Sequence, residues 1–377
     1  MIAFLFIFVG IIVALEMLYF YRRISKTIQS FGKIPGKRTK ITLISLLCVL
    51  GVFCLDISGI VTIAVLHLTA ICLIFQLAGF LVSKIAGKKY ESGFKLWKRI
   101  CGGTLIPIII TLAIVIGGYI NLNNVVRTDY TVKTDKNIRE EGYRIALIAD
   151  VHYGVSLDRE ELIEKCAQIS ECDVDVVILC GDIVDDGTGR EDMAAVFAAF
   201  GSIKSRYGIF YVYGNHDRNM MSLDYQFTNE ELVAEIEKNN ITILRDETYS
   251  VTDDLVLVGR EDRSISRREG ERKSIESLLS SVDQNDFILT LDHQPVEYEE
   301  NAIAGTDLLL SGHTHGGQIW PINLISTLIS ANEAVYGQIK IDSDTEAIVT
   351  SGFAGWSYPI KTSAPSEYVI IEIEPNS

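Results

Sequence analysis

The sequence predicts a membrane-anchored protein with four N-terminal transmembrane helices and a layered α/β domain after them. Three observations lead to this fold class. The chain of 377 residues is 48% hydrophobic and has a mean hydropathy of +0.24, which is high for a purely soluble protein. Long apolar stretches lie before residue 122. After residue 142, short apolar runs alternate with helical patterns, which is typical of a layered α/β domain.

The two parts of the chain differ in charge. Residues 1–122 contain 13 Lys and Arg against 3 Asp and Glu, a net charge of +10. The remaining 21 Lys and Arg and 46 Asp and Glu give the rest of the chain a net charge of −25. A nucleic acid backbone requires a basic face, which this acidic part does not offer. Nucleic acid is therefore excluded as an expected partner.

Four transmembrane segments are predicted at about 1–21, 39–57, 60–82 and 100–122. About 20 apolar residues are needed to cross a bilayer, and each segment is close to that length. The stretch Ile41–Val82 is about twice as long as one crossing. Its one charged residue lies in Asp56–Gly59, where turn-forming residues are grouped. These features predict a helical hairpin with its turn at that point.

The loops between the segments predict the orientation. Arg22–Lys40 contains seven basic residues and no acidic one, and Ser83–Arg99 contains six basic residues and one acidic residue. By the positive-inside rule, both loops are expected in the cytoplasm. The protein is then a multi-pass protein of the cell membrane, and everything after Leu122 is expected on its outer face.

The rest of the chain is divided into a polar linker, 123–142, and a domain, 143–377. Helices are expected at Leu157–Ile169, Glu191–Ile203 and Asn229–Lys238. Asp158 followed by Glu161 has the spacing of an N-terminal cap for the first of them. Strands are expected at Arg144–Ala149, Val174–Cys180, Gly208–Val212, Ile241–Leu244, Leu255–Val258, Phe287–Leu291, Asp307–Leu310, Ala347–Thr350 and Tyr368–Ile373.

Five of the six histidines lie outside the membrane part, each within two residues of Asp, Asn, Gly or another His. Two pairs, Asp150 with His152 and His313 with His315, have one intervening residue, which puts both side chains on one face of an extended segment. Neutral imidazole together with carboxylate and amide oxygens is a ligand set for divalent metals such as Zn, Mn or Fe. The histidines therefore predict a metal site.

These residues occur in a characteristic order: Asp150-Val-His152, Gly181-Asp182-x-x-Asp185, the motif GNHD at 214–217, His293, and the motif GHTH at 312–315. The order resembles the calcineurin-like metallophosphoesterase superfamily over roughly residues 142–377. The sequences LLLSGHTHGGQIW and LTLDHQP are most similar to its membrane-attached bacterial branch, and the four leading segments are similar to those of transmembrane metallophosphoesterases. The resemblance implies a β-sandwich flanked by helices.

The resemblance also implies a dinuclear site for two divalent ions, Mn, Fe, Zn or similar. One ion is expected to bind Asp150, His152, Asp182 and His315. The second is expected to bind Asp182, Asn215, His293 and His313, so that Asp182 bridges the two. The implied enzyme hydrolyses a phosphoester or pyrophosphate by attack of a metal-bridging hydroxide. His216 is the expected non-ligand histidine at the leaving oxygen, with Asp185 orienting it.

The membrane segments favour a lipid or cell-envelope substrate. Two alternatives remain at this point: a cytosol-facing pyrophosphatase acting on a nucleotide-linked diacyl sugar, and a non-catalytic metal-binding membrane receptor. The uncharged segment Ile319–Ala331 is expected either to receive an acyl chain or to belong to the core. Protein Ser/Thr phosphatases of the superfamily have an Arg after GDxxD, where this chain has Asp186, and Lys361 replaces the Arg of a C-terminal family segment.

Overall fold

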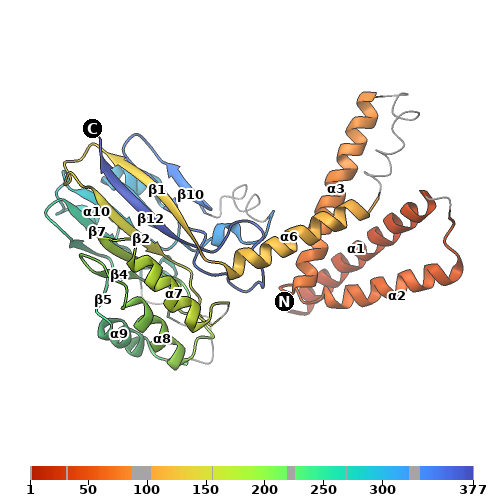
Figure 1. Ribbon diagram of the computed structural model, residues 1–377, viewed down its shortest axis with the longest axis horizontal. Coiled ribbons are helices and arrows are strands. Elements are labelled where there is room, and N and C mark those ends of the chain that lie inside the picture. Colours follow the sequence, from red (N-terminus) through yellow and green to blue (C-terminus); the bar gives the residue numbers. More distant parts are fainter. Residues whose placement is uncertain are drawn as a thin grey trace. The chain divides into compact units, whose positions relative to one another are not determined.

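The computed structural model describes residues 2–30, 33–86, 103–154, 156–218, 226–267, 270–321 and 332–376 (Figure 1). The chain divides into two compact units, a helical unit at Met1–Gly118 and a second unit at Tyr119–Ser377. Helix α6 belongs to both, because it begins in the helical unit and its last residues lie in the second.

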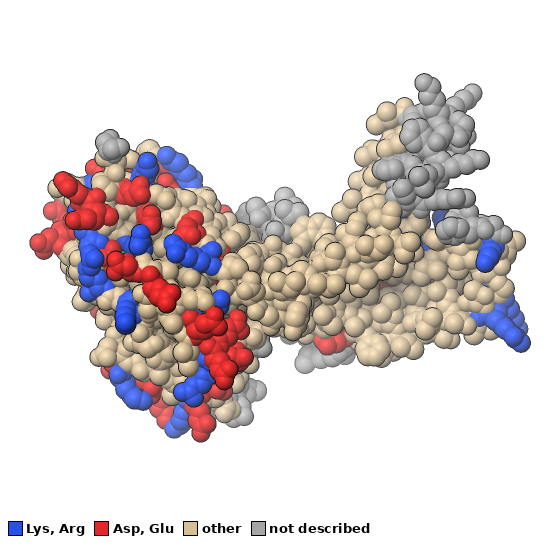
Figure 2. Space-filling view, viewed as in Figure 1, with Lys and Arg blue, Asp and Glu red and all other residues tan. Residues whose placement is uncertain are grey.

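The helical unit contains α1 (Ile2–Ser30), α2 (Lys37–Phe53), α3 (Ile60–Ala86) and the start of α6 (Leu105–Asn123). The chain leaves the helical conformation between α2 and α3, which confirms the turn predicted at Asp56–Gly59. A buried cluster joins the first three helices through Phe20, Leu47 and Cys72. On the face shown in Figure 2, charged side chains cover the second unit, whereas the helical unit is largely uncharged.

Two helices among the described residues are long and apolar enough to cross a membrane, at Ile60–Ile85 and Leu105–Asn123. Less than a third of either segment is buried inside the protein, which supports association with a membrane. Helix α2 has 17 residues and is about 26 Å long, shorter than the hydrocarbon core of about 30 Å. Two of the four predicted spans thus correspond to candidate membrane helices, and the four-helix membrane region is not confirmed. Residues 87–102, with most of the second basic loop, lie outside the described residues.

The second unit is built on two six-stranded sheets. In the first sheet the order is β1-β12-β2-β3-β4-β5, and β2 to β5 run parallel. Its strands are β1 (Val126–Thr134), β2 (Tyr143–Ile148), β3 (Val176–Cys180), β4 (Ile209–Val212), β5 (Ile241–Ile243) and β12 (Glu367–Pro375).

In the second sheet the order is β10-β11-β9-β8-β7-β6, and β7, β8, β9 and β11 run parallel. The outer strands β6 and β10 are antiparallel to their neighbours. The strands of this sheet are β6 (Glu247–Ser250), β7 (Leu255–Gly259), β8 (Phe287–Leu291), β9 (Leu308–Ser311), β10 (Gly337–Lys340) and β11 (Glu346–Val349).

The two sheets face each other across one buried cluster, to which the first contributes Leu147 and Ile178 and the second Leu289 and Leu310. A second cluster packs the outer face of the first sheet against α7 (Arg159–Ser170), α8 (Arg190–Phe200) and α9 (Asn229–Lys238). Helices α10 (Ile275–Leu279) and α11 (Tyr298–Ala304) pack against the second sheet. Two short 3-10 helices lie at Arg263–Arg267 and His315–Gly317. The expected sandwich flanked by helices is confirmed.

The main local correction concerns the segment 123–142, which was predicted as a linker. It contains β1, which pairs in parallel with all nine residues of β12. Exposed and less exposed residues alternate along β1, and most of them are polar or charged. An edge strand with this composition lacks the apolar run by which strands were predicted. The helix starts, in contrast, follow the expectation: Asp158 accepts a hydrogen bond from the backbone N–H of Glu161 at 2.9 Å.

Candidate metal centre

Each predicted ligand lies in a loop directly after a strand. Asp150 and His152 follow β2, Asp182 follows β3, and Asn215 follows β4, all in the first sheet. His293 follows β8, and His313 and His315 follow β9, in the second sheet. Because neighbouring parallel strands end at the same edge of a sheet, these loops meet there. The sandwich brings the two edges together.

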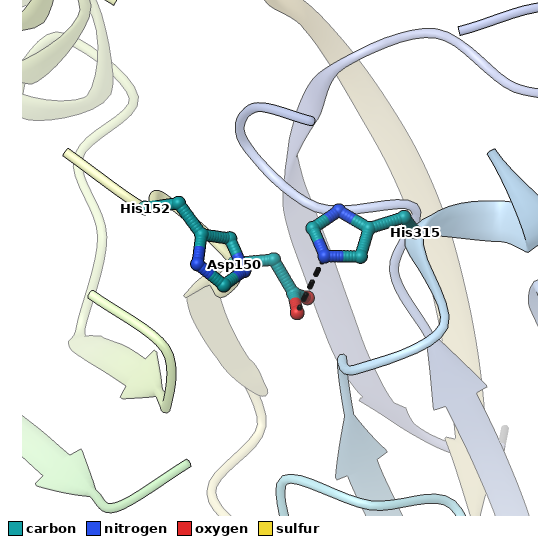
Figure 3. Close-up of side chains that lie close together, drawn as sticks. All are labelled: Asp150, His152 and His315. Carbon is teal, nitrogen blue, oxygen red and sulfur yellow. Dashed lines mark ion pairs between the residues drawn. The ribbon is translucent and has the colours of Figure 1, made fainter. Parts of the chain in front are cut away.

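A first group consists of Asp150, His152 and His315, whose ligand atoms all lie within 4.8 Å of one another. Figure 3 shows the three side chains converging, with Nε2 of His315 3.6 Å from Oδ1 of Asp150. The rings of His152 and His315 are stacked, with their centroids 5.1 Å apart. Within the described part of the chain, Nε2 of His152 is buried without a hydrogen-bond partner. A metal ion would satisfy that nitrogen.

A second group consists of Asp182, His293 and His313. Nδ1 of His293 lies 2.8 Å from the carbonyl oxygen of Cys180. Donation from Nδ1 to this carbonyl leaves Nε2 as the free nitrogen, the arrangement that orients metal-binding histidines. Oδ1 of Asn215 is also buried and has no hydrogen-bond partner among the described residues.

Asp182 lies between the two groups. Its Oδ2 is 3.7 Å from Nε2 of His152 in the first group and 3.1 Å from Nε2 of His293 in the second. Its Oδ1 accepts a hydrogen bond from the backbone N–H of His216 at 2.8 Å. One carboxylate thus contacts a histidine of each group, as a shared ligand must.

Burial sets the protonation of the site. It raises the pKa of Asp150 to about 6 and lowers the pKa of His313 to about 4. Burial also lowers the pKa of His315 well below its usual value. For Asp182, burial acts to raise the pKa, but the nearby imidazole of His293 holds it below its usual value. Burial also acts to lower the pKa of His152 and His293, but the nearby carboxylates of Asp185 and Asp182 hold both pKa values above the usual one. Because a metal binds the neutral imidazole, an ion at these two histidines would displace a proton. The imidazole and carboxylate donors of the two groups fit divalent ions.

The backbone at the site is strained. Asp150, Asp182 and His313 have φ values of 53°, 53° and 70°, in the left-handed region that non-glycine residues seldom adopt. Such residues cost about 1–3 kcal/mol each and are concentrated at functional sites. Gly181 has a φ of 81°. A Cβ there would lie 2.6 Å from Nδ1 of His293 and 2.7 Å from the backbone N of Gly214, so only glycine fits.

Asp217 holds two of these loops together, although the sequence assigned it no role. Its buried carboxylate accepts hydrogen bonds from the backbone N–H groups of Asp182, Ile183 and Gly214 at 2.8, 2.8 and 2.6 Å. The loop after β3 is therefore tied to the loop after β4. An acidic residue at a glycine-containing turn was the available signal, but its partners Asp182 and Ile183 are distant in the sequence.

His216 lies beside the first group and is held by two carboxylates. Its Nδ1 is 3.2 Å from Oδ1 of Asp185 and 3.0 Å from Oδ2 of Asp186. The same Asp185 oxygen is 3.3 Å from Nδ1 of His152. The structure thus brings Asp185 to His216. It also adds Asp186 as a second partner of His216, whereas Asp186 was noted from the sequence only because it stands where some relatives have an Arg.

Lys361 lies inside the protein. Its fully buried ammonium donates to the carbonyl oxygens of Ser351, Ala354 and Gly352 at 2.6, 3.3 and 3.4 Å. Burial lowers its pKa to about 7. These contacts hold the loop after β11 in place. The ammonium of Lys361 is thus occupied by hydrogen bonds to backbone carbonyls. Of the apolar segment Ile319–Ala331, Ile319 is buried, and residues 322–331 lie outside the described residues.

Comparisons with known proteins agree with this geometry. The sequence model of the calcineurin-like phosphoesterase family matches residues 143–317. An uncharacterised metallophosphoesterase of Helicobacter pylori is 29% identical over 249 residues, which cover 66% of this chain and 63% of that protein. A Danio rerio transmembrane protein with a metallophosphoesterase domain is 25% identical over 279 residues, 72% of this chain and 62% of that protein.

A third relative, an uncharacterised metallophosphoesterase of Aquifex aeolicus, is 28% identical over 271 residues, 70% of this chain and 98% of that protein. The matches to the Helicobacter and Danio proteins cover less than two thirds of their lengths. The family match begins at the first residue of β2 and ends just after the second histidine of GHTH. Residues 143–317, which carry the metal-ligand groups, therefore match the calcineurin-like phosphoesterase family.

Proposed function

We propose that the protein is a membrane-anchored phosphohydrolase that uses two divalent metal ions to cleave a phosphoester or pyrophosphate, in a lipid or cell-envelope substrate. The main support for this proposal is that the buried Nε2 atoms of His152 and His293 lie 3.7 and 3.1 Å from the same carboxylate oxygen, Oδ2 of Asp182. The relatives named metallophosphoesterase support the same class of activity.

The residues divide between the two ions as the ligand groups suggest. Asp150, His152 and His315 would hold one ion, and His293, His313 and Asn215 the other, with Asp182 common to both. When bound, such ions lower the pKa of a coordinated water and neutralise charge on phosphoryl oxygens. Asp217 would keep the shared ligand in place, because it accepts hydrogen bonds from the backbone N–H groups of Asp182 and of the next residue, Ile183.

His216 is proposed as the proton donor to the leaving oxygen. Asp185 and Asp186 both contact its Nδ1, which makes Nε2 the nitrogen available to the substrate. Asp185 and Asp186 would act as positioning residues through His216.

An assay of the solubilised full chain tests the proposal. We expect hydrolysis of at least one class in a panel of phosphomonoesters, phosphodiesters, pyrophosphates and phospholipids. Chelation should abolish turnover, and Mn, Fe or Zn should restore it. Bound metal without turnover of any substrate would instead favour a non-catalytic metal-binding receptor.

Asp182→Asn is the sharpest variant for the dinuclear assignment. The change weakens the one ligand proposed to be shared, so both the metal content and turnover should fall, turnover by a factor of about 100 or more. Elemental analysis of the purified variant measures the metal directly. Asp129→Asn, a change at an exposed carboxylate on β1, is the matched control and should retain both. Two metals per chain and near-parental turnover in Asp182→Asn would show that the assignment is wrong.

A further inference from the structure

One loop joins the metal centre to the end of helix α6. This loop connects β11 to β12 and runs from Thr350 to Ser366. The backbone N–H of Ala354 donates to the carbonyl of Asp150 at 3.0 Å, and its carbonyl oxygen lies 3.3 Å from Nδ1 of His315. The loop therefore forms one wall of the first ligand group.

The same loop holds the last turn of α6. The side-chain amide of Asn121 donates to the carbonyl of Lys361 at 3.2 Å. A Cβ on Gly355 would lie 2.6 Å from Cδ1 of Leu122, so helix and loop are in close contact. The backbone N–H of Ser366 donates to the carbonyl of Asn121 at 2.8 Å. The end of α6 is thus a fixed part of the second unit.

The length of α6 limits where the membrane surface can lie. Its 19 residues span about 28 Å, against about 30 Å for the hydrocarbon core of a bilayer. If α6 crosses the membrane, its whole length is needed to span the hydrocarbon core. Its last residues, Tyr119–Asn123, must then lie at the boundary with the headgroups. The headgroup region is only roughly 5–7 Å deep in each leaflet. The loop bonded to Asn121 and Leu122 then lies at that depth.

The tip of this loop, Trp356–Pro359, has the composition of a membrane interface. Trp356, Ser357 and Pro359 are exposed, and Tyr358 is partly exposed. Tyr119, at the end of α6, is also exposed. Trp and Tyr favour the interface because one end of each side chain is apolar and the other polar. The ring of Trp356 is also 5.0 Å from the ring of His216, so the tip borders the metal centre.

We propose that the tip loop, Trp356–Pro359, rests on the headgroup region of the phospholipid bilayer that α6 crosses. The site then takes its substrate from that leaflet, as the phosphoester headgroup of a membrane-embedded amphiphile. The choice of substrate rests on the proposed hydrolysis, whereas the placement of the loop does not. The two parts can therefore fail separately.

Fluorescence of the full chain in lipid vesicles tests the placement without any turnover. The chain has three Trp residues, so the difference between the parent and Trp356→Phe isolates the emission of Trp356. Phospholipids brominated near the headgroup end of their acyl chains should quench this emission. Equal emission in brominated and ordinary vesicles would overturn the placement.

Ser343→Trp in the Trp356→Phe chain is the matched control. Ser343 is exposed and lines the same cavity as Thr134. Thr134 is the last residue of β1, about 26 Å along the strand from Val126, which follows shortly after α6. The new Trp should escape quenching. Quenching of both Trp residues to the same degree would show a general association of the unit with lipid and would contradict the proposal.

Kinetics in the same vesicles test the substrate. Ser357→Asp places a negative charge on the tip, at a φ of 62° that Asp tolerates. With anionic vesicles it should raise the KM for a long-chain alkyl phosphate, relative to that for a soluble aryl phosphate, about five-fold, the size of effect one charge has at such a surface. Ser343→Asp should leave this ratio unchanged. An unchanged ratio in Ser357→Asp would overturn the lipid substrate, and quenching without turnover of either ester would instead contradict the proposed hydrolysis.

Discussion

His216 is the residue at which binding of the metals and catalysis can be separated. Both predicted ion sites have their own histidines, and Nδ1 of His216 is already occupied by the carboxylates of Asp185 and Asp186. A residue placed in this way can act on the leaving group without holding a metal. Its removal should therefore affect turnover and leave the metal content intact.

We expect His216→Ala to retain both metals and to lose turnover by a factor of about 10² to 10⁴, the usual contribution of a general acid. The loss should be larger for esters with poor alkoxide leaving groups than for activated aryl esters, which need no proton. Measurement of kcat across a series of leaving groups checks this. An equal loss for all leaving groups would contradict proton donation.

For Asp217 we predict an effect on stability, because its role is structural. Asp217→Asn replaces an acceptor oxygen by an amide that faces backbone N–H groups, and buried donors without a partner cost about 1–3 kcal/mol each. The melting temperature of the solubilised chain should fall by at least about 2–4 °C, the shift expected for 1 kcal/mol in a domain of this size. The melt is recorded with a chelator, so that loss of metal does not contribute. The exposed variant Asp129→Asn should melt like the parent, and an equal melting temperature for Asp217→Asn would argue against the clamp.

The residues proposed as metal ligands could be singled out from the sequence because each of them lies shortly after an apolar strand. Asp150, Asp182 and His293 are recognisable from local patterns alone. The roles of Asp217, Asp186 and Lys361 could not be predicted. Asp217 and Lys361 bind backbone groups, which carry no mark in the sequence, and Asp186 meets His216 only after two strands have paired.

At the scale of elements, most of the strands that the sequence predicted are buried on both faces, with the edge strand β5 as an exception. Strands β3, β7 and β8 consist entirely of buried residues, and such strands read as continuous apolar runs. The strands that were missed, β1, β6 and β10, lie at sheet edges and have exposed residues along their length. Burial on both faces produces the continuous apolar run, so an edge strand without such a run is missed.

Strand β1 provides the test at this scale. Val132 on β1 is buried in the core between the sheets, whereas its neighbour Thr131 is exposed. Val132→Ala removes two buried methyl groups and should destabilise the second unit by about 2 kcal/mol. Thr131→Ala should have little effect. The melting temperatures of both variants check this, and equal tolerance of the two changes would mean that 123–142 is a linker after all.

At the scale of the whole molecule, the open question is the side of the membrane on which the metal centre lies. By the positive-inside rule, the basic loop Arg22–Lys40 is expected in the cytoplasm, and the chain after Leu122 is then expected on the outer face. The relatives named as transmembrane proteins support a membrane location and leave the side open. The side matters for the substrate, because a nucleotide-linked diacyl sugar is met only in the cytosol and an envelope lipid can be met outside.

Cysteine labelling on intact cells decides between these sides. Asn137 is exposed and lies in 123–142, so Asn137→Cys should react with a membrane-impermeant thiol reagent before lysis. Thr39→Cys, in the basic loop, is the matched control and should react only after lysis. Both are made in a Cys172→Ser chain, since Cys172 is the partly exposed cysteine among those described in the second unit. If Asn137→Cys reacts only after lysis and Thr39→Cys reacts before it, the metal centre faces the cytosol. The pyrophosphatase acting on a nucleotide-linked diacyl sugar would then replace the envelope phosphohydrolase as the proposed function.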